Sequence, residues 1–380
     1  MSLRPSLTRL KSTAAVLTAA AGLVLAGGLS TAAQAAPDPA SASASTPASA
    51  STPASAPAPA SAGRAATGAS AAAPDAIGVC SSATVSGAAV RGALPQTEVH
   101  RLLAPLTAQH RAQYGIAAKG PLGAPAAAGA TSGAAGTGAG ASTAAGASMA
   151  AGASTAAVRP LVDIHPAQGT AFKSQSGADG SCATQSVSTQ LTVRESATTI
   201  YTPTMYPPGG SCVELVTVYT PSSRMVAAWD WCRSVNFAAS VTINSAFLTT
   251  YTGGTGAYTG RVIRTSAASN TWSAQLYNHS TSRWDTLFTQ SGTNQSGRTD
   301  GWDIEELYST VGSSGRAYSC DEMAGLTFES SNISVRNNGT WSVASTANSD
   351  THYDSPNSAF YCPTRSFQMV SAYDHWKDVG

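Results

Sequence analysis

The sequence predicts an all-β protein, an antiparallel β-sandwich of jelly-roll type, preceded by a signal peptide and low-complexity linkers with one short helix. Beyond residue 159 Ala becomes scarcer, and Thr, Val, Tyr and Trp, which favour strands, become prominent. All seven tryptophans lie after residue 228. Short strand-like stretches there alternate with breaks of Gly, Pro, Asn and Ser. A closed β-barrel is the alternative architecture.

The first 35 residues have the pattern of a secretory signal peptide. Basic residues at the start precede an apolar run at 14–29, and Ala33-Gln34-Ala35 forms a small-x-small cleavage site. The run is short and rich in Ala, so a retained membrane anchor is the weaker interpretation. We therefore expect an extracellular, secreted protein.

Two low-complexity tracts follow the signal peptide. Residues 36–79 are rich in Ala, Ser, Pro and Thr, and residues 121–158 in Ala, Gly, Ser and Thr. Neither tract carries enough large apolar side chains to offset the entropy of ordering the chain. Both are predicted to be disordered linkers.

Residues 80–120, between these tracts, predict one short helix. Val99, Leu102, Leu103 and Leu106 recur at helical spacing, and Pro105 inside the pattern is expected to kink or interrupt it. Because one short helix cannot fold alone, it either docks on the rear domain with Cys80 as a tether, or serves as a propeptide-like segment or spacer.

Residues 159–380 form the predicted sandwich domain. Its expected strands cover residues 191–201, 213–219, 225–231, 241–251, 258–265, 271–278, 284–290, 302–308, 326–335, 340–343 and 366–370. Asn338-Gly339 lies between two of them and predicts a tight hairpin turn, while 277–284 predicts a longer hairpin loop.

Six cysteines in an exported chain predict three disulfides, because the compartment is oxidising. The sequence cannot choose among the many pairings. The pairing that we favour is Cys212 with Cys232, Cys320 with Cys362, and Cys80 with Cys182. No Cys/His spacing suits zinc, so no metal site is predicted from these residues.

Charge excludes several classes of partner. Charged residues make up 11% of the chain and the formal net charge is +1. There is no basic stripe for nucleic acid and no polybasic patch for an anionic membrane. A monomer that binds a neutral polysaccharide or glycan, without a cofactor, fits this balance.

Aromatic residues supply the candidate ligand contacts. Trp229 and Trp231 would share one face of a strand, about 7 Å apart, as a platform for sugar rings. Packing in the core is the alternative, and it is favoured because large aromatic side chains are mostly buried. The candidate ligand-binding residues are Trp231, Trp284, Tyr277 and Asp303.

A second group of candidates is a carboxylate run. If Trp302 and Ile304 face inward, Asp303 and Glu305 share the outer face, where they could perform acid–base chemistry or coordinate calcium. Glu306 would share the face of Trp302 and Ile304, and burial would raise its pKa. A solvated strand end is the favoured alternative.

Glu214 is an unusual charge in an apolar strand, on the face of Val216 and Val218. A strand-end Glu that reaches solvent or pairs with Arg is the favoured interpretation. It is still a candidate catalytic carboxylate, together with Glu306 or Glu329. No Gly-x-Ser-x-Gly elbow accompanies His375, so a serine triad has no sequence support.

Several motifs together resemble a group of secreted bacterial proteins that are labelled carbohydrate-binding or uncharacterised. They are Tyr206-Pro207-Pro208-Gly209-Gly210-Ser211-Cys212, Trp229-Asp230-Trp231-Cys232, Gly301-Trp302-Asp303 and Thr327-Phe328-Glu329-Ser330-Ser331. The resemblance covers roughly residues 195–380 and implies a β-sandwich and extracellular life. It carries over no catalytic residue. More distantly, the scattered carboxylates resemble secreted β-sandwich peptidases that use glutamates, although no motif matches.

The sequence thus favours a secreted, non-catalytic carbohydrate-binding protein that uses exposed aromatic side chains. One alternative is a secreted hydrolase, of glycosidase or glutamate peptidase type, with a carboxylate pair drawn from Glu214, Asp303, Glu305, Glu306 and Glu329. Another is an extracellular structural or adhesive protein, which predicts an exposed apolar patch.

Overall fold

The computed structural model describes residues 76–114, 162–351 and 355–380. These residues belong to one compact unit, Ala69–Gly380. The predicted signal peptide and the predicted linker at 121–158 lie outside the described residues, as does most of the linker at 36–79.

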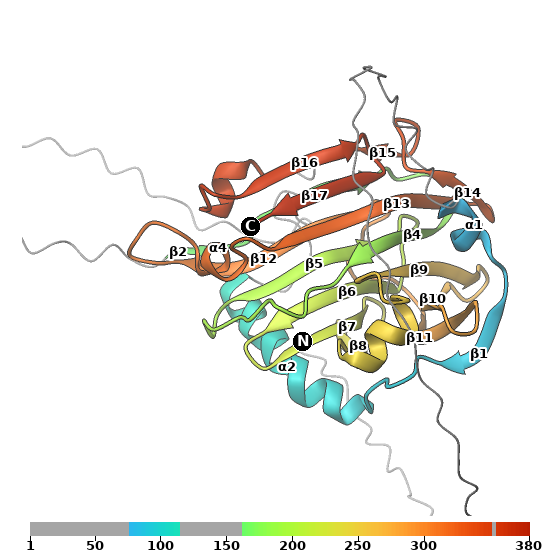
Figure 1. Ribbon diagram of the computed structural model, residues 1–380. Helices are drawn as coiled ribbons and strands as arrows, with labels where there is room; N and C mark the ends of the chain where they lie inside the picture. The colour runs from blue at the N-terminus through green and yellow to red at the C-terminus, as the bar shows by residue number, and fades with distance from the viewer. Residues whose placement is uncertain (1–75, 115–161, 352–354) are drawn as a thin grey trace, which may run out of the picture. The chain divides into compact units, whose positions relative to one another are not determined.

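Two sheets form the fold (Figure 1). The order in the nine-stranded sheet is β1 (Val85–Ala89), β11 (Arg283–Ser291), β10 (Thr271–Asn278), β9 (Ala257–Ser266), β4 (Ala178–Ser186), β13 (Thr327–Asn337), β17 (His375–Val379) and β16 (Ser366–Ser371), with β14 (Thr340–Val343) beside β13. The order in the eight-stranded sheet is β15 (Ser349–Asp350), β3 (Ala167–Phe172), β12 (Gly301–Val311), β5 (Thr199–Tyr206), β6 (Val213–Thr220), β7 (Ser223–Asp230) and β8 (Asn236–Thr242), with β2 (Val162–Ile164) beside β12.

Strand pairing confirms the predicted antiparallel β-sandwich. Among the described strands, every pair is antiparallel except β1 with β11. The predicted turn at Asn338-Gly339 joins β13 to β14, and both residues adopt positive φ, as this tight hairpin requires.

The eight-stranded sheet is buried on both faces. Leu215 of β6 belongs to the apolar cluster that fills the space between the sheets, with Val262 and Trp376 of the nine-stranded sheet. Its neighbour Val216 belongs to a second cluster on the opposite side of β6. We call this opposite side the outer face. Burial on both sides is predicted by the sequence of β6, which places apolar side chains on both of its faces.

Helices occupy the edges of the sandwich. They are α1 (Ala76–Ser81), α2 (Gln96–Tyr114), α3 (Ser245–Tyr251), α4 (Tyr318–Glu322) and the 3-10 helix η1 (Asn357–Phe360). No helix within the described ranges is both long enough and apolar enough to cross a membrane.

The predicted helix near Leu103 is confirmed as α2, and it continues through Pro105 as one element. It runs along β8 (Figure 1), where its apolar side chains are buried. The strand predicted over 241–251 is wrong in its second half, which forms α3. Asn244 caps that helix, because its side-chain oxygen accepts a hydrogen bond from the Phe247 backbone N–H at 3.0 Å.

All three predicted disulfides form: Cys80–Cys182, Cys212–Cys232 and Cys320–Cys362. Cys80–Cys182 joins α1 to β4 of the nine-stranded sheet, and β1 then adds an edge strand to that sheet beside β11. The segment that precedes the low-complexity linker is therefore built into the sandwich.

Candidate active site

Strand register arranges the outer face of the eight-stranded sheet into three rows across β12, β5, β6 and β7. The first row holds Trp302, Tyr206, Glu214 and Trp229; the second holds Ile304, Thr204, Val216 and Ala227; the third holds Glu306, Tyr201, Val218 and Met225. Most members of the second row have small side chains, whereas the two flanking rows carry the aromatic rings and the carboxylates.

Glu214 lies in the middle of the first row and is fully buried. Its Oε1 accepts hydrogen bonds from Thr204 Oγ1 at 2.6 Å and from Trp302 Nε1 at 3.2 Å. Its Oε2 accepts one from Trp231 Nε1 at 3.1 Å. Three neutral donors therefore orient this carboxylate on the outer face. The interpretation of Glu214 as a strand end that reaches solvent is wrong.

Glu306 lies in the third row and forms a second polar group. Its Oε1 is 2.7 Å from His165 Nε2 and accepts a hydrogen bond from the Tyr308 hydroxyl at 2.9 Å. The His165 and Tyr308 rings stack, with centroids 3.8 Å apart. All three residues are buried. Glu306 does share a face with Trp302 and Ile304, as the alternation predicts.

Glu214 and Glu306 both affect the pKa of two phenols on the outer face. Burial first, and then the negative charges of Glu306 and Glu214, raise the pKa of Tyr201 well above its usual value. Burial and the same two charges also raise the pKa of Tyr308. Both phenols therefore remain protonated, and the Tyr308 hydroxyl donates its hydrogen bond to Glu306.

The predicted pairing of Asp303 with Glu305 on an exposed face is wrong, because both side chains point between the two sheets. Asp303 is fully buried and accepts hydrogen bonds from Gln185 Nε2 and Trp376 Nε1, both at 2.9 Å. Burial raises the pKa of Asp303 to about 7. Partners on the nine-stranded sheet satisfy this carboxyl, so it can lie inside the sandwich.

Glu305 forms a buried ion pair with Arg365, whose Nη2 lies 2.9 Å from Glu305 Oε1. The same guanidinium lies 2.9 Å from Asp378 Oδ1 on β17. Glu305 therefore has a structural partner, and it is not available for acid–base chemistry at the outer face. Within the described residues no group of three or more His, Cys, Asp and Glu side chains is arranged to hold a metal ion, calcium included.

Glu329 is distant from these residues. It lies on β13 of the nine-stranded sheet and contacts His375 Nε2 of β17 at a partly exposed position. The structure therefore brings Glu214 and Glu306 to one face, and it separates them from Asp303, Glu305 and Glu329.

The sugar platform of Trp229 and Trp231 does not form, and core packing, the favoured interpretation of these two rings, is confirmed. Trp231 and Trp284 are only 4% and 0% exposed. Trp231 packs in the outer-face cluster, and Trp284 packs beside the Cys80–Cys182 disulfide with Tyr277, which is partly buried, at its edge. With Asp303 also buried, none of these candidates presents an exposed ring or carboxylate, except for part of Tyr277. The structure gives carbohydrate binding no support.

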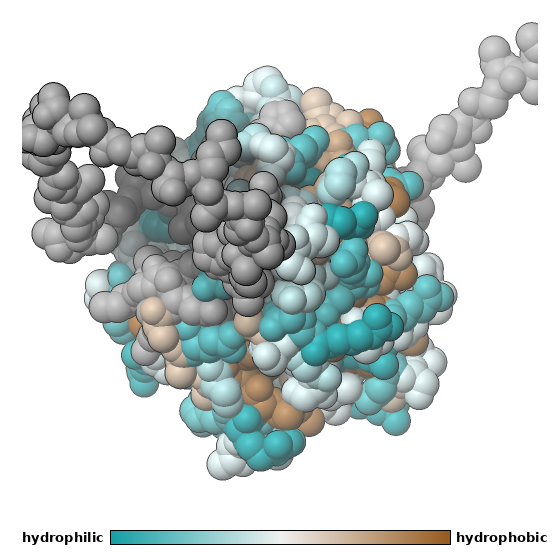
Figure 2. Space-filling model, turned by 90° about the vertical axis from the view of Figure 1, so that its left-hand side faces the viewer, coloured by the Kyte–Doolittle hydropathy of each residue, from teal (hydrophilic) through white to brown (hydrophobic). Residues whose placement is uncertain are grey.

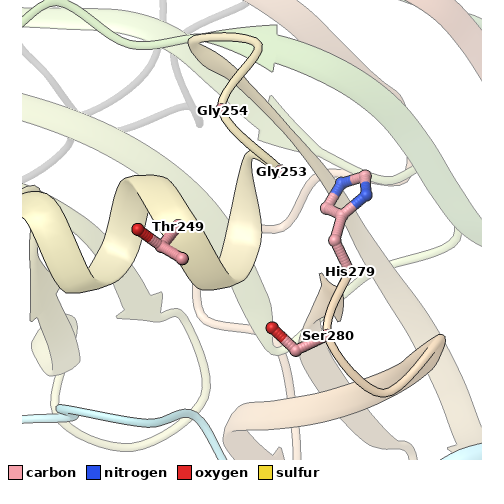
Figure 3. A pocket seen from close by; sticks show the side chains of 5 residues that line it. All are labelled: Thr249, Gly253, Gly254, His279 and Ser280. Carbon is pink, nitrogen blue, oxygen red and sulfur yellow. The ribbon is translucent and has the colours of Figure 1, made fainter. Parts of the chain in front are cut away.

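Surface features add little to the choice of function. The exposed large apolar side chains lie on separate elements: Ile77, Val85, Val162, Tyr318, Val343, Tyr361 and Val370. On the side seen in Figure 2, apolar residues form small patches among hydrophilic ones. A hollow of about 340 Å³ lies beside α3, lined by Thr249, Gly253, Gly254, His279 and Ser280 (Figure 3). Its one titratable side chain, His279, has a pKa lowered by burial.

No family model matches the chain, and no curated protein matches it. Among solved structures, the chain is similar to scytalido-glutamic peptidase bound to a peptide-based transition state analog, with 15% identity and a TM-score of 0.35. It is also similar to SCP-B, a member of the eqolisin family of peptidases, in complex with the tripeptide Ala-Ile-His, with 16% identity and a TM-score of 0.34. Each match covers 58% of this chain and 98% of the other. A likeness at this level carries no weight for activity.

Sequence reasoning identified both outer-face carboxylates but missed His165. This residue precedes the predicted strands and lies 141 residues from Glu306. Its only sequence signal is the apolar alternation of a short stretch next to a linker. The indole donors Trp231 and Trp302 were expected to pack or to bind sugar, and their hydrogen bonds to Glu214 had no sequence signal.

Proposed function

We propose that the chain is a secreted hydrolase that cleaves an extended, peptide-like polymer on the outer face of the eight-stranded sheet, with Glu214 as the proton-transferring group. The observation that carries the proposal is the carboxylate of Glu214, oriented by three neutral donors in a row of aromatic rings. Glu305 lies between the sheets in an ion pair with Arg365 and is not on this face.

This arrangement suits general acid–base catalysis. Glu214 would take a proton from a water molecule as the water oxygen bonds to the carbonyl carbon of the substrate. It would then give that proton to the leaving nitrogen as the carbon–nitrogen bond breaks. The glutamate returns to its starting state, and the net reaction consumes one water. Tyr201 and Tyr308 stay protonated on the same face, and Tyr308 donates to Glu306 there.

A peptide-like substrate fits better than a glycoside. Glu214 and Glu306 lie two strands apart and four residues out of register, so their Cα atoms are about 16 Å apart. Unless both side chains point directly at each other, their carboxyls lie farther apart than the paired carboxyls of glycosidases, which are about 5–9.5 Å apart. A single glutamate is therefore the catalytic group, and Glu306 with His165 would bind the chain.

Secretion is the second part of the proposal. The predicted signal peptide motivates it, and the three disulfides support it because such bonds persist in oxidising compartments.

The test is the variant Glu214→Gln in the chain that starts at residue 36. The variant keeps the size of the side chain but cannot transfer the proton. We expect cleavage of denatured casein, followed by mass spectrometry at acidic and neutral pH, to fall by about 10²–10⁴-fold. Glu329→Gln, on the other sheet, is the matched control and should cleave at the parent rate.

An unchanged cleavage rate in Glu214→Gln, with near-UV circular dichroism like that of the parent, would contradict the role of Glu214. Retention of the parent on insoluble polysaccharide, with no peptide cleaved, would favour the carbohydrate-binding alternative.

A further inference from the structure

We infer that α2 is an inhibitory pro-segment, docked over part of the outer face, which slows substrate binding for as long as it is docked. This inference rests on the proposed function. It starts from the burial of the site: Glu214, Glu306 and the whole middle row are fully buried, so the outer face is closed in the structure.

The apolar side of α2 is part of that closure. Val99 and Leu103 are fully buried and Leu106 nearly so, in one cluster with Trp229, Trp231 and Phe237. Trp231 is also a donor to Glu214. The helix therefore packs against β8 and belongs to the same apolar cluster as Trp231, which donates a hydrogen bond to the proposed catalytic group.

Polar contacts fix α2 to the edge of the sheet. Thr107 Oγ1 donates to Asn236 Oδ1 of β8 at 2.6 Å. Just before the helix, the Leu94 backbone N–H donates to the Ser240 carbonyl of the same strand at 2.8 Å. The exposed side of α2 carries His100 and the Glu98–Arg101 pair, which touch nothing on the sheet among the described contacts.

The segment before α2 has its own attachment to the sandwich, which does not involve the helix. The Cys80–Cys182 disulfide and the β1–β11 pairing hold residues 80–89 on the other sheet. The helix can therefore detach from β8 without disturbing the core between the sheets. Its three buried apolar side chains contribute to the outer-face cluster and not to that core.

The experiment places a charge on the docked side of the helix. Leu103→Asp should undock α2, and Leu103→Ala should weaken its docking with less risk to folding. His100→Asp introduces the same charge on the exposed side and is the matched control. Each full chain from residue 36 is measured in two ways: acrylamide quenching of tryptophan fluorescence, and cleavage of denatured casein.

We expect Leu103→Asp to raise both tryptophan quenching and the cleavage rate, the latter at least tenfold, with Leu103→Ala intermediate and His100→Asp unchanged. Increased quenching with cleavage at the parent rate would overturn the inhibitory role and leave the proposed function standing. Unchanged quenching in both Leu103 variants would show that α2 is not a removable cover. An absence of cleavage in every variant, despite increased quenching, would overturn the proposed hydrolase itself.

Discussion

At the residue scale, Glu214 and Glu305 show how neighbours decide the role of a buried carboxylate. Both side chains are fully buried. Glu305 lies between the sheets against Arg365, so its charge is neutralised by an ion pair. Glu214 lies on the outer face, where an alcohol and two indoles donate hydrogen bonds to its carboxylate. These donors fix the direction of the Glu214 carboxylate on the face where the rows of aromatic rings lie.

Asp303 makes the stability of the fold depend on pH. Burial raises the pKa of this carboxyl from 3.8 to about 7, so the native state holds its proton more tightly than the unfolded state does. The stabilisation is fully present below about pH 4 and is lost as the pH rises through about 7. A difference of this size corresponds to at most about 4 kcal/mol.

We therefore expect the free energy of unfolding in urea to fall between about pH 4 and about pH 8. Asp303→Asn should reduce that dependence, because the amide does not ionise, and the part due to the raised pKa of Asp378 should remain. It should also lower the stability at every pH, since one of the donors Gln185 and Trp376 would then face an amide N–H. Asp350→Asn, at an exposed position, is the control. A slope in Asp303→Asn equal to that of the parent would assign the pH dependence to other groups.

At the element scale, β1 depends on its tether. It is a short, largely exposed strand that pairs in parallel with β11. The Cys80–Cys182 disulfide holds the chain just before it, and Arg261 supports that segment by donating to the Cys80 carbonyl at 3.0 Å and the Ser82 carbonyl at 2.8 Å. Arg261 also lies over the Trp284 ring. Local pairing alone would leave an edge strand of this length marginal.

Replacing Cys80 and Cys182 by Ser should therefore release β1. The cross-link joins residues 102 positions apart, and it stabilises the fold by lowering the entropy of the unfolded chain. Its loss should therefore reduce the free energy of unfolding by at most about 4–5 kcal/mol. We expect hydrogen exchange to accelerate throughout β1 while β12 stays protected. The Cys320→Ser/Cys362→Ser pair serves as the control. Protection of β1 that survives in the first variant would show that pairing with β11 is sufficient.

At the scale of the whole molecule, Arg365 joins the two sheets. Its guanidinium contacts Glu305 of the eight-stranded sheet and Asp378 of the nine-stranded sheet, each at 2.9 Å, and lies over the Phe360 ring. Burial, followed by the negative charge of Glu305, raises the pKa of Asp378 to about 9. One cation thus serves two buried carboxyls, one of which keeps its proton at neutral pH.

Arg365→Met should destabilise the protein by about 3–5 kcal/mol near neutral pH, because it leaves buried carboxyls without their cation. The loss should shrink in acid, where both carboxyls are protonated. Lys173→Met, which removes an exposed pair with Asp350, should change the stability by less than about 1 kcal/mol. If the two substitutions lower the free energy of unfolding equally in denaturant titrations, Arg365 does not hold the two sheets together.

The strands, the tight turn and the helix α2 were predictable because their signals are local. Alternation with period two, an Asn-Gly pair and apolar spacing at a helical period depend only on neighbouring residues. The same local reasoning failed at Ser245–Tyr251, where the cap by Asn244 starts a helix. It also failed before residue 187, where β3 and β4 consist mostly of small and polar residues, with Phe172 as the one large apolar side chain.

The sequence by itself determined the class of fold, the disulfide content and the presence of Glu214 on one face with Val216 and Val218. Only the tertiary structure decided which face of β12 is the outer one, since both faces of that strand carry apolar and charged side chains. It also brought His165 to Glu306 and two indoles to Glu214. These contacts join residues far apart in the chain, and they form only when sheet order and register place those strands side by side.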